Sequence, residues 1–403
     1  MKLGLLGLGQ RGYTMLEASI VHFDVNIVAV CDLYEDRVEN AQKLISEKMG
    51  QSPKGFTNSD EFFAEEMDAV LIMTSWESHV SLAITAMKKG IVTGLEVGGA
   101  YSVDDCFALV RAYEETKTPF MMMENCCFGK DELLATAMAR KGMFGEIVHC
   151  SGKYGHDLRY EVSNGEKLRH YRLRNYLNRN CENYPTHELL PIAKLLNINR
   201  GNRMVSLVSV ASKAAGVRDY IAEHKDEIPA ELHNATFKQG DIIDTIITCA
   251  NGETIRLCLD TTLPRFYDRG FTVRGTKGMY MQTSNSVILD GKTPEYWEPA
   301  LAMEKLLNNA KEYEEHLPAV WKEMTEEKTK VGHGGMDGIE LAIFFDCVEN
   351  KKEMPIDVYD AASAMVISVL SEASIAQGGA PMTIPDFTSG AWISRKPKDV
   401  VEL

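Results

Sequence analysis

The chain has 403 residues, 45% of them hydrophobic, and a formal net charge of -15. This charge disfavours nucleic acids and anionic membranes as partners, because phosphate groups are bound mainly by clustered Lys and Arg. A neutral or cationic small molecule is the expected ligand. At about 150 residues per domain, the length predicts two domains. No apolar stretch approaches the roughly 18 residues of a membrane span, and the opening residues lack the features of a signal peptide, so we expect a cytoplasmic protein.

The cysteine pattern indicates free thiols. The nine cysteines form no C-x-x-C pair, and the neighbours Cys126 and Cys127 do not have zinc-site spacing. We therefore expect reduced thiols that pack mainly in the core, as in a reducing compartment. The residues His156, Asp157 and His187 are metal ligands by type, but no ligand spacing supports them, and we expect no metal.

The first residues predict a nucleotide-binding turn. Lys2–Leu6 has the composition of a buried strand, and the glycines after it follow the pattern G-x-G-x-x-G before a helix. In such turns the first glycine permits the turn, the second lets a pyrophosphate approach the backbone, and the third lets helix and strand pack closely. The helix N-terminus supplies N–H donors for the phosphates. The predicted cofactor contacts here are Gly7, Gly9, Gln10, Arg11 and Gly12.

An acid ends the second predicted strand, Val25–Asp32. Asp32 lies twenty residues after Gly12, where a carboxylate accepts hydrogen bonds from the adenosine ribose hydroxyls. It would repel a 2′-phosphate, and the next residue is Leu33 and not an arginine. NAD is therefore favoured over NADP.

Strands and helices alternate as far as Asn125. This pattern predicts an α/β domain with a doubly wound parallel sheet, a Rossmann domain, over residues 1–125. The predicted strands are Asp68–Ser75, Ile91–Val97 and Pro119–Asn125, and the predicted helices are His79–Gly90 and Val103–Lys117. Ligands of such sheets bind beyond the carboxyl ends of the strands. The cofactor candidates at these ends are Thr74, Trp76, His79, Glu96 and Glu124. His79 is equally a helix-start residue that touches only backbone.

A run of strands follows, so residues 126–403 are expected to form an α+β substrate domain with a mainly antiparallel open sheet. The predicted strands are Glu146–Tyr154, Met204–Val210, Ile242–Ala250, Glu253–Asp260, Phe271–Gly275 and Met279–Gln282. Apolar periodicity predicts helices at Met336–Asn350 and Ala361–Gly378, which we expect to pack back on the first domain. The charge run Lys322–Lys330 is interpreted as a solvated helix face.

Two polar clusters lie in the predicted second domain: "YGHDLRYE" at Tyr154–Glu161 and "NYPTHELL" at Asn183–Leu190. Tyr184 and His187 are three residues apart and share one face if a helix begins at Pro185. The buried face of that helix is marked by Leu189, Ile192, Ala193 and Leu196. His333, in "HGGMD", precedes a predicted helix in a glycine loop.

The whole arrangement resembles the glucose–fructose oxidoreductase (Gfo/Idh/MocA) superfamily. Many of those proteins carry a Glu-Lys-Pro motif whose lysine helps proton transfer at a sugar hydroxyl. Here the corresponding residues are Glu96, Val97 and Gly98, so the lysine is absent. A simple dehydrogenase would lack its usual base.

A narrower resemblance accounts for that gap. The motifs "MMENCCFG", "YGHDLR", "YPTHELLPIAKLLNINRGNR", "RFYDRGFTVRGTKG" and "GHGGMD" are similar to those of glycoside hydrolase family 109, the NAD-dependent α-N-acetylgalactosaminidase-like glycosidases. The resemblance implies a resident NAD used as a transient electron sink, a glycoside substrate and a homo-oligomer. Two departures, Gly98 where many relatives have proline and Glu188 where many have glycine, leave the identity of the sugar open.

The resemblance also implies roles for particular residues. Tyr154 would be the base near the sugar, with His187 and Glu124 as the other catalytic groups. The sugar-binding residues would be Arg172, Tyr184, Tyr267 and His333. The implied reaction oxidises C3 of the sugar, removes the acidified C2 proton, expels the C1 substituent, adds water and reduces C3 again. Such a sequence needs several proton carriers, which general acid–base groups supply.

Each candidate has a structural alternative. Tyr154, Tyr184 and Tyr267 are alternatively packing tyrosines, and His187 a core histidine. Arg172 is alternatively a surface charge in an Arg-rich stretch, and His333 a helix cap. Asp157 and Arg159 are expected to form an internal ion pair, while the role of His156 is left open. The alternative functions are an NAD-dependent sugar or polyol dehydrogenase and a non-catalytic NAD-binding sensor.

Overall fold

The computed structural model describes residues 1–403 and divides them into two compact units. The first unit consists of Met1–Phe128 and Glu323–Ala362, and the second of Gly129–Lys322 and Ser363–Leu403. The sequence places the boundary after residue 125 and assigns everything beyond it to one domain. In the structure the chain returns to the first unit for the forty residues from Glu323 to Ala362.

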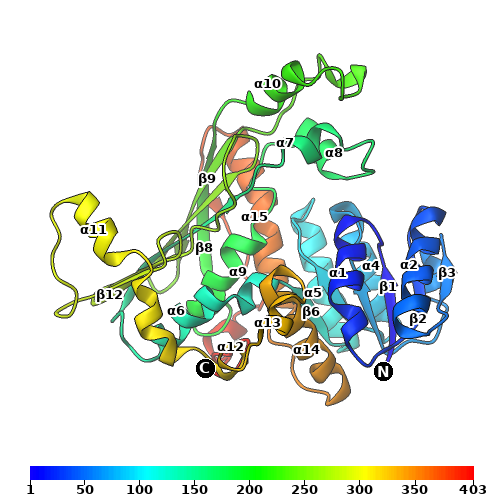
Figure 1. Cartoon of the computed structure of the whole chain (residues 1–403), viewed down its shortest axis with the longest axis horizontal. Coiled ribbons are helices and arrows are strands. Elements are labelled where there is room, and N and C mark those ends of the chain that lie inside the picture. The colour runs from blue at the N-terminus through cyan, green and yellow to red at the C-terminus, as the bar shows by residue number, and fades with distance from the viewer. The chain divides into compact units, whose positions relative to one another are not determined.

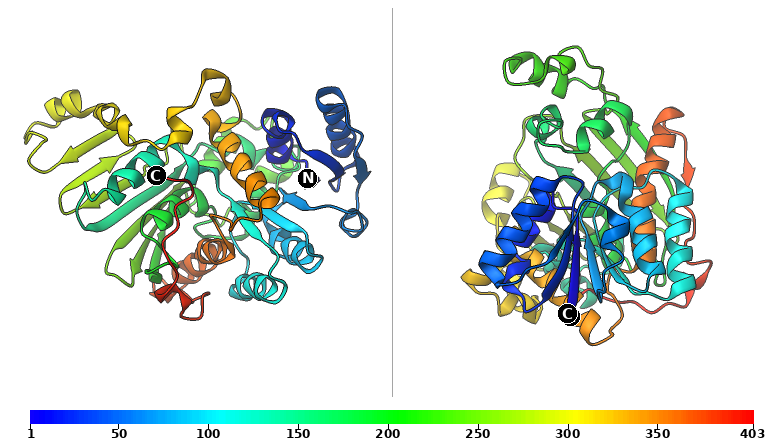
Figure 2. Two further views of the ribbon diagram at one scale, coloured as in Figure 1. Left: turned by 90° about the horizontal axis from the view of Figure 1, so that it is seen from below. Right: turned by 90° about the vertical axis from the view of Figure 1, so that its right-hand side faces the viewer.

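The first unit is built on a six-stranded parallel sheet, as predicted. In spatial order its strands are β3 (Lys54–Phe56), β2 (Asn26–Cys31), β1 (Lys2–Leu6), β4 (Ala69–Ile72), β5 (Val92–Glu96) and β6 (Phe120–Met123). The strands β4 and β6 are apolar and buried along their whole length, which is typical of parallel strands covered on both faces. Figure 2 (right) shows helices on either side of this sheet.

The helices of this sheet are α1 (Gln10–Ala18), α2 (Glu35–Met49), α3 (Ser59–Phe62), α4 (Trp76–Lys88) and α5 (Val103–Thr116). α4 begins three residues before the predicted start at His79, because Ser75 has the extended backbone of an N-cap. The returning segment adds α13 (Glu326–Thr329) and α14 (Met336–Glu349). α14 contacts the 3-10 turn η2 (Asn125–Phe128), so the predicted helix after Met336 belongs to the first unit.

The second unit contains an eight-stranded sheet that is antiparallel except where β7 and β10 pair in parallel. The spatial order is β13 (Ser286–Leu289), β12 (Gly278–Met281), β11 (Thr272–Gly275), β7 (Ile147–Gly155), β10 (Thr254–Asp260), β9 (Ile242–Cys249), β8 (Met204–Ala211) and β14 (Met382–Thr383). The six predicted strands are present with ends shifted by one residue or so. The short strands β13 and β14 were not predicted.

One face of this sheet is covered by helices (Figure 1). α9 (Thr186–Leu195) packs on β7 and β10, and α6 (Lys130–Arg140) packs on α9. Along β9, buried residues alternate with partly or fully exposed ones, and the exposed ones lie on the other face of the sheet. The remaining helices of this unit are α7 (Arg159–Ser163), α8 (Arg172–Asn178), α10 (Gly216–Glu223), α11 (Pro299–Leu306) and α12 (Ala319–Lys322).

Two sequence-based expectations about composition are refined by the structure. α15 (Val358–Ala376) is 19 residues long with mean hydropathy 1.3, which matches a membrane span by length and composition, contrary to expectation. However, 72% of this apolar window is buried inside the protein, as in a core helix.

The charge run Lys322–Lys330 forms only the four-residue helix α13, whose residues are exposed. All nine cysteines are free thiols, and eight of them are buried.

Candidate functional site

The glycine turn of the first unit has the geometry that its sequence predicts. Gly7 has φ 95°, and a Cβ there would lie 2.5 Å from the Met73 carbonyl carbon. A Cβ on Gly12 would lie 2.0 Å from the Gly7 carbonyl oxygen. Since real Cβ atoms never approach so closely, both positions require glycine, and the turn and α1 pack in direct contact.

Asp32 closes this turn from the end of β2. Its Oδ2 accepts a hydrogen bond from the Leu8 N–H at 2.7 Å, and its Oδ1 accepts one from Tyr34 at 3.1 Å. Arg37 lies beside it, with Nη1 3.6 Å from Asp32 Oδ1 and the guanidinium 4.8 Å from the centre of the Tyr34 ring. The residue directly after Asp32 is Leu33, which is not a cation. Arg37 is the third residue of α2 and carries no motif that identifies it.

Three predicted cofactor residues lie where β4 meets α4. His79 is fully buried, and its Nε2 lies 3.0 Å from the Thr74 carbonyl oxygen. Burial lowers the pKa of His79 to about 4, so the ring is neutral at pH 7. This backbone contact is the alternative that the sequence left open. Trp76 is also buried, and a Cβ on Gly98 would lie 2.4 Å from its ring, so the residue that departs from the family pattern is a packing partner of Trp76.

Arg11 lies within a cluster of acids and not in open space. Its Nη1 and Nη2 donate to the two carboxylate oxygens of Asp337 at 2.8 and 3.1 Å, and its Nε donates to Glu96 at 3.3 Å. Burial opposes ionisation of Asp337, but hydrogen bonds from His333 and the charge of Arg11 outweigh it and hold the pKa of Asp337 well below its usual range. Asp337 was not predicted, because it is 326 residues from Arg11 in sequence.

His333 and Glu124 belong to the same unit. His333 Nδ1 lies 2.8 Å from Asp337 Oδ2, just before α14. Glu124 is fully buried, and its Oε1 accepts the Cys126 N–H at 3.0 Å. Glu340 is a further buried acid of this region, and burial, followed by the charge of Asp337, raises its pKa. The structure thus places His333 beside Asp337 and Arg11, and Arg11 also bonds to Glu96 at the end of β5.

The second unit brings the two polar clusters of the sequence together in one group of rings. The Tyr154 ring centre lies 4.5 Å from that of Tyr184, 5.6 Å from His187 and 6.4 Å from Tyr267. The Tyr154 hydroxyl lies 3.2 Å from His156 Nδ1. Burial, and then the charge of Arg172, lowers the pKa of His156, so its ring is neutral at pH 7. His156, which the sequence left open, therefore contacts Tyr154 directly.

Arg172 is buried, so the interpretation as a surface charge is wrong. Its Nη1 donates to the Glu161 carboxylate, and its guanidinium lies 5.2 Å from the centre of the Tyr184 ring. Burial favours the neutral form of Glu161, but the Arg172 charge outweighs it and lowers the pKa of Glu161. Glu161 is the last residue of the first polar cluster, but its bond with Arg172 was not predicted, because a glutamate on a short helix carries no distinctive pattern.

α9 packs tightly enough on β7 to bring Tyr184 and His187 against Tyr154. Pro185 is its N-cap and Thr186 its first residue, one position later than predicted. A Cβ on Gly152 would lie 2.3 Å from the Glu188 carbonyl oxygen, so glycine permits this approach. Leu189 and Ile192 of the predicted buried face are fully buried, but every residue of α9 except His187 is buried, so the helix has no exposed face.

Two further predictions concern the first polar cluster and Glu188. Asp157 and Arg159 form the expected ion pair, with Arg159 Nη2 2.7 Å from Asp157 Oδ2. Glu188 is buried, and its Oε2 accepts the Cys258 N–H at 3.0 Å. Its carboxyl group therefore bonds to the backbone of β10, where the sequence analysis had left its role open.

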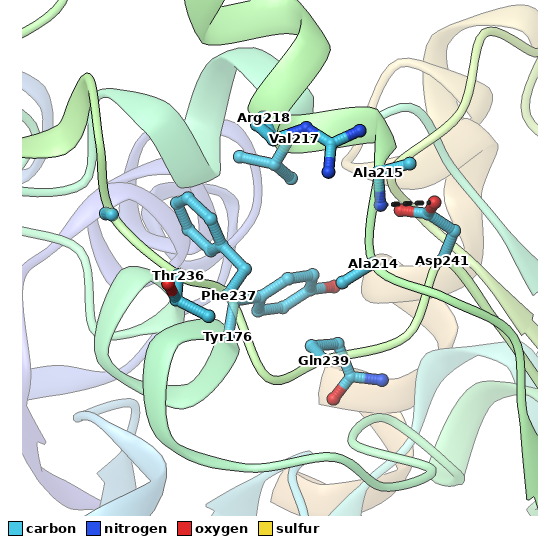
Figure 3. Close-up of a pocket in the computed structure, with 10 residues that line it drawn as sticks. Tyr176, Ala214, Ala215, Val217, Arg218, Thr236, Phe237, Gln239 and Asp241 are labelled. Carbon is cyan, nitrogen blue, oxygen red and sulfur yellow. Dashed lines mark hydrogen bonds between the residues drawn. The ribbon is translucent and has the colours of Figure 1, made fainter.

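A cavity of about 120 Å³ lies elsewhere in the second unit, beside α10 (Figure 3). Its polar lining groups already have partners: Asp241 accepts the N–H groups of Ala215 and Gly216, and Gln239 donates to the Cys181 carbonyl. None of the predicted site residues lines it. The ring cluster around Tyr154 is the better candidate for chemistry.

Comparisons with known proteins agree with this arrangement. Residues 1–124 match the oxidoreductase family with an NAD-binding Rossmann fold, and residues 128–394 match the C-terminal domain of glycosyl hydrolase 109. An α-N-acetylgalactosaminidase of Tannerella forsythia is 37% identical, covering 98% of this chain and 88% of the relative. A glycosyl hydrolase family 109 protein of Stenotrophomonas maltophilia is 35% identical, covering 98% and 91%.

Solved structures share the fold at low identity. A myo-inositol 2-dehydrogenase from Lactobacillus plantarum has a TM-score of 0.66 at 14% identity, covering 96% of this chain and 99% of its own. A scyllo-inositol dehydrogenase from Lactobacillus casei with NAD(H) and scyllo-inositol has a TM-score of 0.65 at 12% identity, covering 95% and 99%. With a full-length relative at 37% identity and a family match over most of the second unit, this chain belongs to glycosyl hydrolase family 109, and its N-terminal part is an NAD-binding Rossmann fold of the Gfo/Idh/MocA type.

Proposed function

We propose that the protein is an NAD-dependent glycosidase that cleaves a glycoside, α-N-acetylgalactosaminides first among them, by transient oxidation of the sugar ring. The observation that carries the proposal is the group of ionisable rings around Tyr154. In this family 109 chain, the buried Val97 occupies the position where Gfo/Idh/MocA dehydrogenases carry their lysine. The name of the Tannerella forsythia relative supports the choice of sugar.

The residues of the first unit fit a dinucleotide. Gly7 and Gly12 form a cradle in which no side chain has room, so backbone N–H groups can approach a pyrophosphate. Asp32, at the end of β2, would meet the adenosine ribose. When bound, NAD supplies hydride transfer to and from C3 of the sugar, with no net consumption.

The residues of the second unit supply the proton transfers. Oxidation at C3 acidifies the C2 proton, which Tyr154 removes as phenolate; the electron pair then expels the C1 substituent. A free phenol has a pKa near 10, so Tyr154 needs help near pH 7. The buried Arg172 guanidinium favours the phenolate, and the neutral His156, 3.2 Å away, can accept the phenol proton.

The remaining steps need a second proton carrier. The Tyr184 hydroxyl and His187 Nε2 are 3.4 Å apart on the N-terminal end of α9, and this pair would hold the proton that the departing group or the attacking water exchanges. The same pair would first take the C3 hydroxyl proton, when C3 is oxidised, and pass it to the departing group. Water then adds at C1 and gives its proton to the pair, which returns it to the C3 oxygen when C3 is reduced, while C2 regains its proton from Tyr154. Each such acid–base contribution is worth about 10² to 10⁴-fold in rate.

Exchange in heavy water tests the proposal. The purified protein is incubated with p-nitrophenyl α- and β-glycosides in D2O without added cofactor. We expect release of the aglycone and deuterium at C2 of the product, because that carbon is deprotonated and reprotonated. Stoichiometric NADH without aglycone would instead identify a dehydrogenase, and the absence of both products would identify a binding protein.

A further inference from the structure

Two acids of the second unit are buried together beneath the ring cluster. Glu182 and Glu188 are 0% and 1% exposed, and their carboxyl groups are close enough for one to donate to the other when it is protonated. The Cys258 N–H donates to Glu188 Oε2 at 3.0 Å. The backbone groups of Tyr184 and Leu259 lie near the Glu182 carboxyl, and that of Tyr154 near Glu188, but none of the other three side-chain oxygens of the pair completes a hydrogen bond with them. Carboxylate oxygens only accept, so two ionised groups here would face each other without a donor between them.

No cation is among the groups that act on Glu182 or Glu188. The cation closest in register is Lys153 on β7, opposite Cys258, and its Nζ lies 3.9 Å from Asp268. The titratable side chain of β10 beside Glu188 is Cys258, and Asp244 on β9 adds a further negative charge. From β7, the peptide group of Tyr154 faces Glu188, and the phenol is the titratable group of that residue. On α15 the neighbour is Ser371, whose Oγ accepts the Glu182 N–H at 2.8 Å. On α6, Arg140 bonds to the opposite, C-terminal end of α9.

We propose that Glu182 and Glu188 share one proton and act as a positioning pair that holds Tyr184 and His187 against Tyr154. The two acids stand at either end of the short segment that carries Tyr184 and His187. At one end of this segment the Glu182 N–H donates to Ser371 Oγ. At the other end the Glu188 carboxyl group accepts the Cys258 N–H. Cys258 precedes Leu259, which is the register partner of Tyr154. The catalytic consequence rests on the proposed function, whereas the shared proton does not.

The shared proton gives the site a pH dependence with a defined sign. Burial raises the pKa of Glu188 to about 7, and burial together with the charge of Glu188 raises that of Glu182 above its ordinary value. A free glutamate has a pKa near 4.3, so the folded state binds the proton more tightly than the unfolded chain. Glu188 ionises first, as the pH rises through about 7, and the proton that Glu182 then shares with it is released at a higher pH. The stabilisation is fully present below pH 4 and is lost in these two steps.

The test replaces the proton with an amide. In Glu188→Gln of the full chain, the amide oxygen still accepts from Cys258 and the NH2 group donates to Glu182, so no proton is needed. We expect kcat near pH 6 to change by no more than about three-fold. We also expect the alkaline limbs, the falls of kcat and Tm at high pH, to move up by about one pH unit or more. Glu182→Gln should behave alike. The control is Asp244→Asn, which removes a nearby charge that is paired with Arg256 and that raises the pKa of Glu188, so its alkaline limbs should move slightly down and not up.

A second readout does not need catalysis. Infrared difference spectra in D2O between pH 6 and pH 9 should show a protonated carboxyl band that disappears with the same midpoint as the Tm limb and is absent in Glu188→Gln. The proposal would be overturned if the alkaline limbs of Glu188→Gln were unchanged, or if those of Asp244→Asn moved up equally. The absence of the carboxyl band would overturn it as well. Loss of the glycosidase proposal alone would leave the Tm and infrared results standing.

Discussion

Each unit buries a group of acids, and the two groups are neutralised in different ways. In the first unit, Asp337 and Glu96 surround Arg11, and the charge of this arginine keeps Asp337 ionised. In the second unit, Glu182 and Glu188 face each other without a cation, and we infer a proton between them. The difference teaches that burial alone does not set the charge of an acid; its partner does. It also predicts that the first group of acids loses its stabilising contribution at acid pH and the second at alkaline pH.

The largest expected effect separates the chemistry of the second unit from the nucleotide binding of the first. Tyr154→Phe keeps the ring, which packs on Tyr184, but removes the hydroxyl that contacts His156. We expect kcat to fall by about 10² to 10⁴-fold, with NAD binding and Tm unchanged. Enzyme kinetics and NAD titration check this, and a fully active variant would remove Tyr154 as the base.

The first unit should respond strongly when its cation is removed. Arg11→Met leaves Asp337 and Glu96 buried without their guanidinium partner, and an unpaired buried charge costs about 3 kcal/mol or more. We expect the free energy of unfolding to fall by about that amount, measured by chemical denaturation at pH 7. Lys43→Met, in an exposed ion pair with Glu47, is the control and should change it by less than about 0.5 kcal/mol. Equal stability of Arg11→Met and the native chain would show that this cluster is not held by charge.

A smaller effect is expected from packing in the first unit, where no charge changes. In Gly98→Ala the new methyl group would lie 2.4 Å from the Trp76 ring. Overpacking of this kind costs about 1 to 3 kcal/mol, so Tm should fall and the tryptophan fluorescence should shift. Gly142→Ala is the control, because its Cβ has open space around it but its φ is positive, at 72°. It therefore shows the effect of backbone strain without a collision. A Gly98→Ala protein as stable as the native chain would mean that Trp76 moves freely.

The smallest effect is a change of slope at acid pH. The folded-state pKa of Asp337 is depressed, so its stabilisation is present above the unfolded value near 3.9 and is lost as the pH falls below it. Asp337→Asn, which cannot titrate, should lose less Tm between pH 5 and pH 3 than the native chain. The infrared band of the Glu182 and Glu188 pair should be unaffected, because Asp337 belongs to the other unit. A variant that changed the midpoint of that band would break the contrast between the two units.

Local sequence was sufficient for the parts whose structure depends on near neighbours. The glycine turn at Gly7 and Gly12 was predictable because a tight turn and a close helix leave no room for side chains. Most strands of both sheets followed from their apolar patterns, and the exceptions are the short strands β3, β13 and β14. The clusters at Tyr154–Glu161 and Asn183–Leu190 could be recognised as unusual. Their chemistry, a tyrosine base with histidine and arginine beside it, was implied by resemblance to a family.

Tertiary structure decided which distant groups became partners. The bond between Arg11 and Asp337 spans 326 residues, and the return of Glu323–Ala362 to the first unit creates it. The contact of Glu188 with Cys258 exists because β7 and β10, about a hundred residues apart in sequence, pair in parallel beneath α9. No local pattern records such pairings, since burial, counter-charge and the resulting pKa of a group depend on what the folded chain places around it.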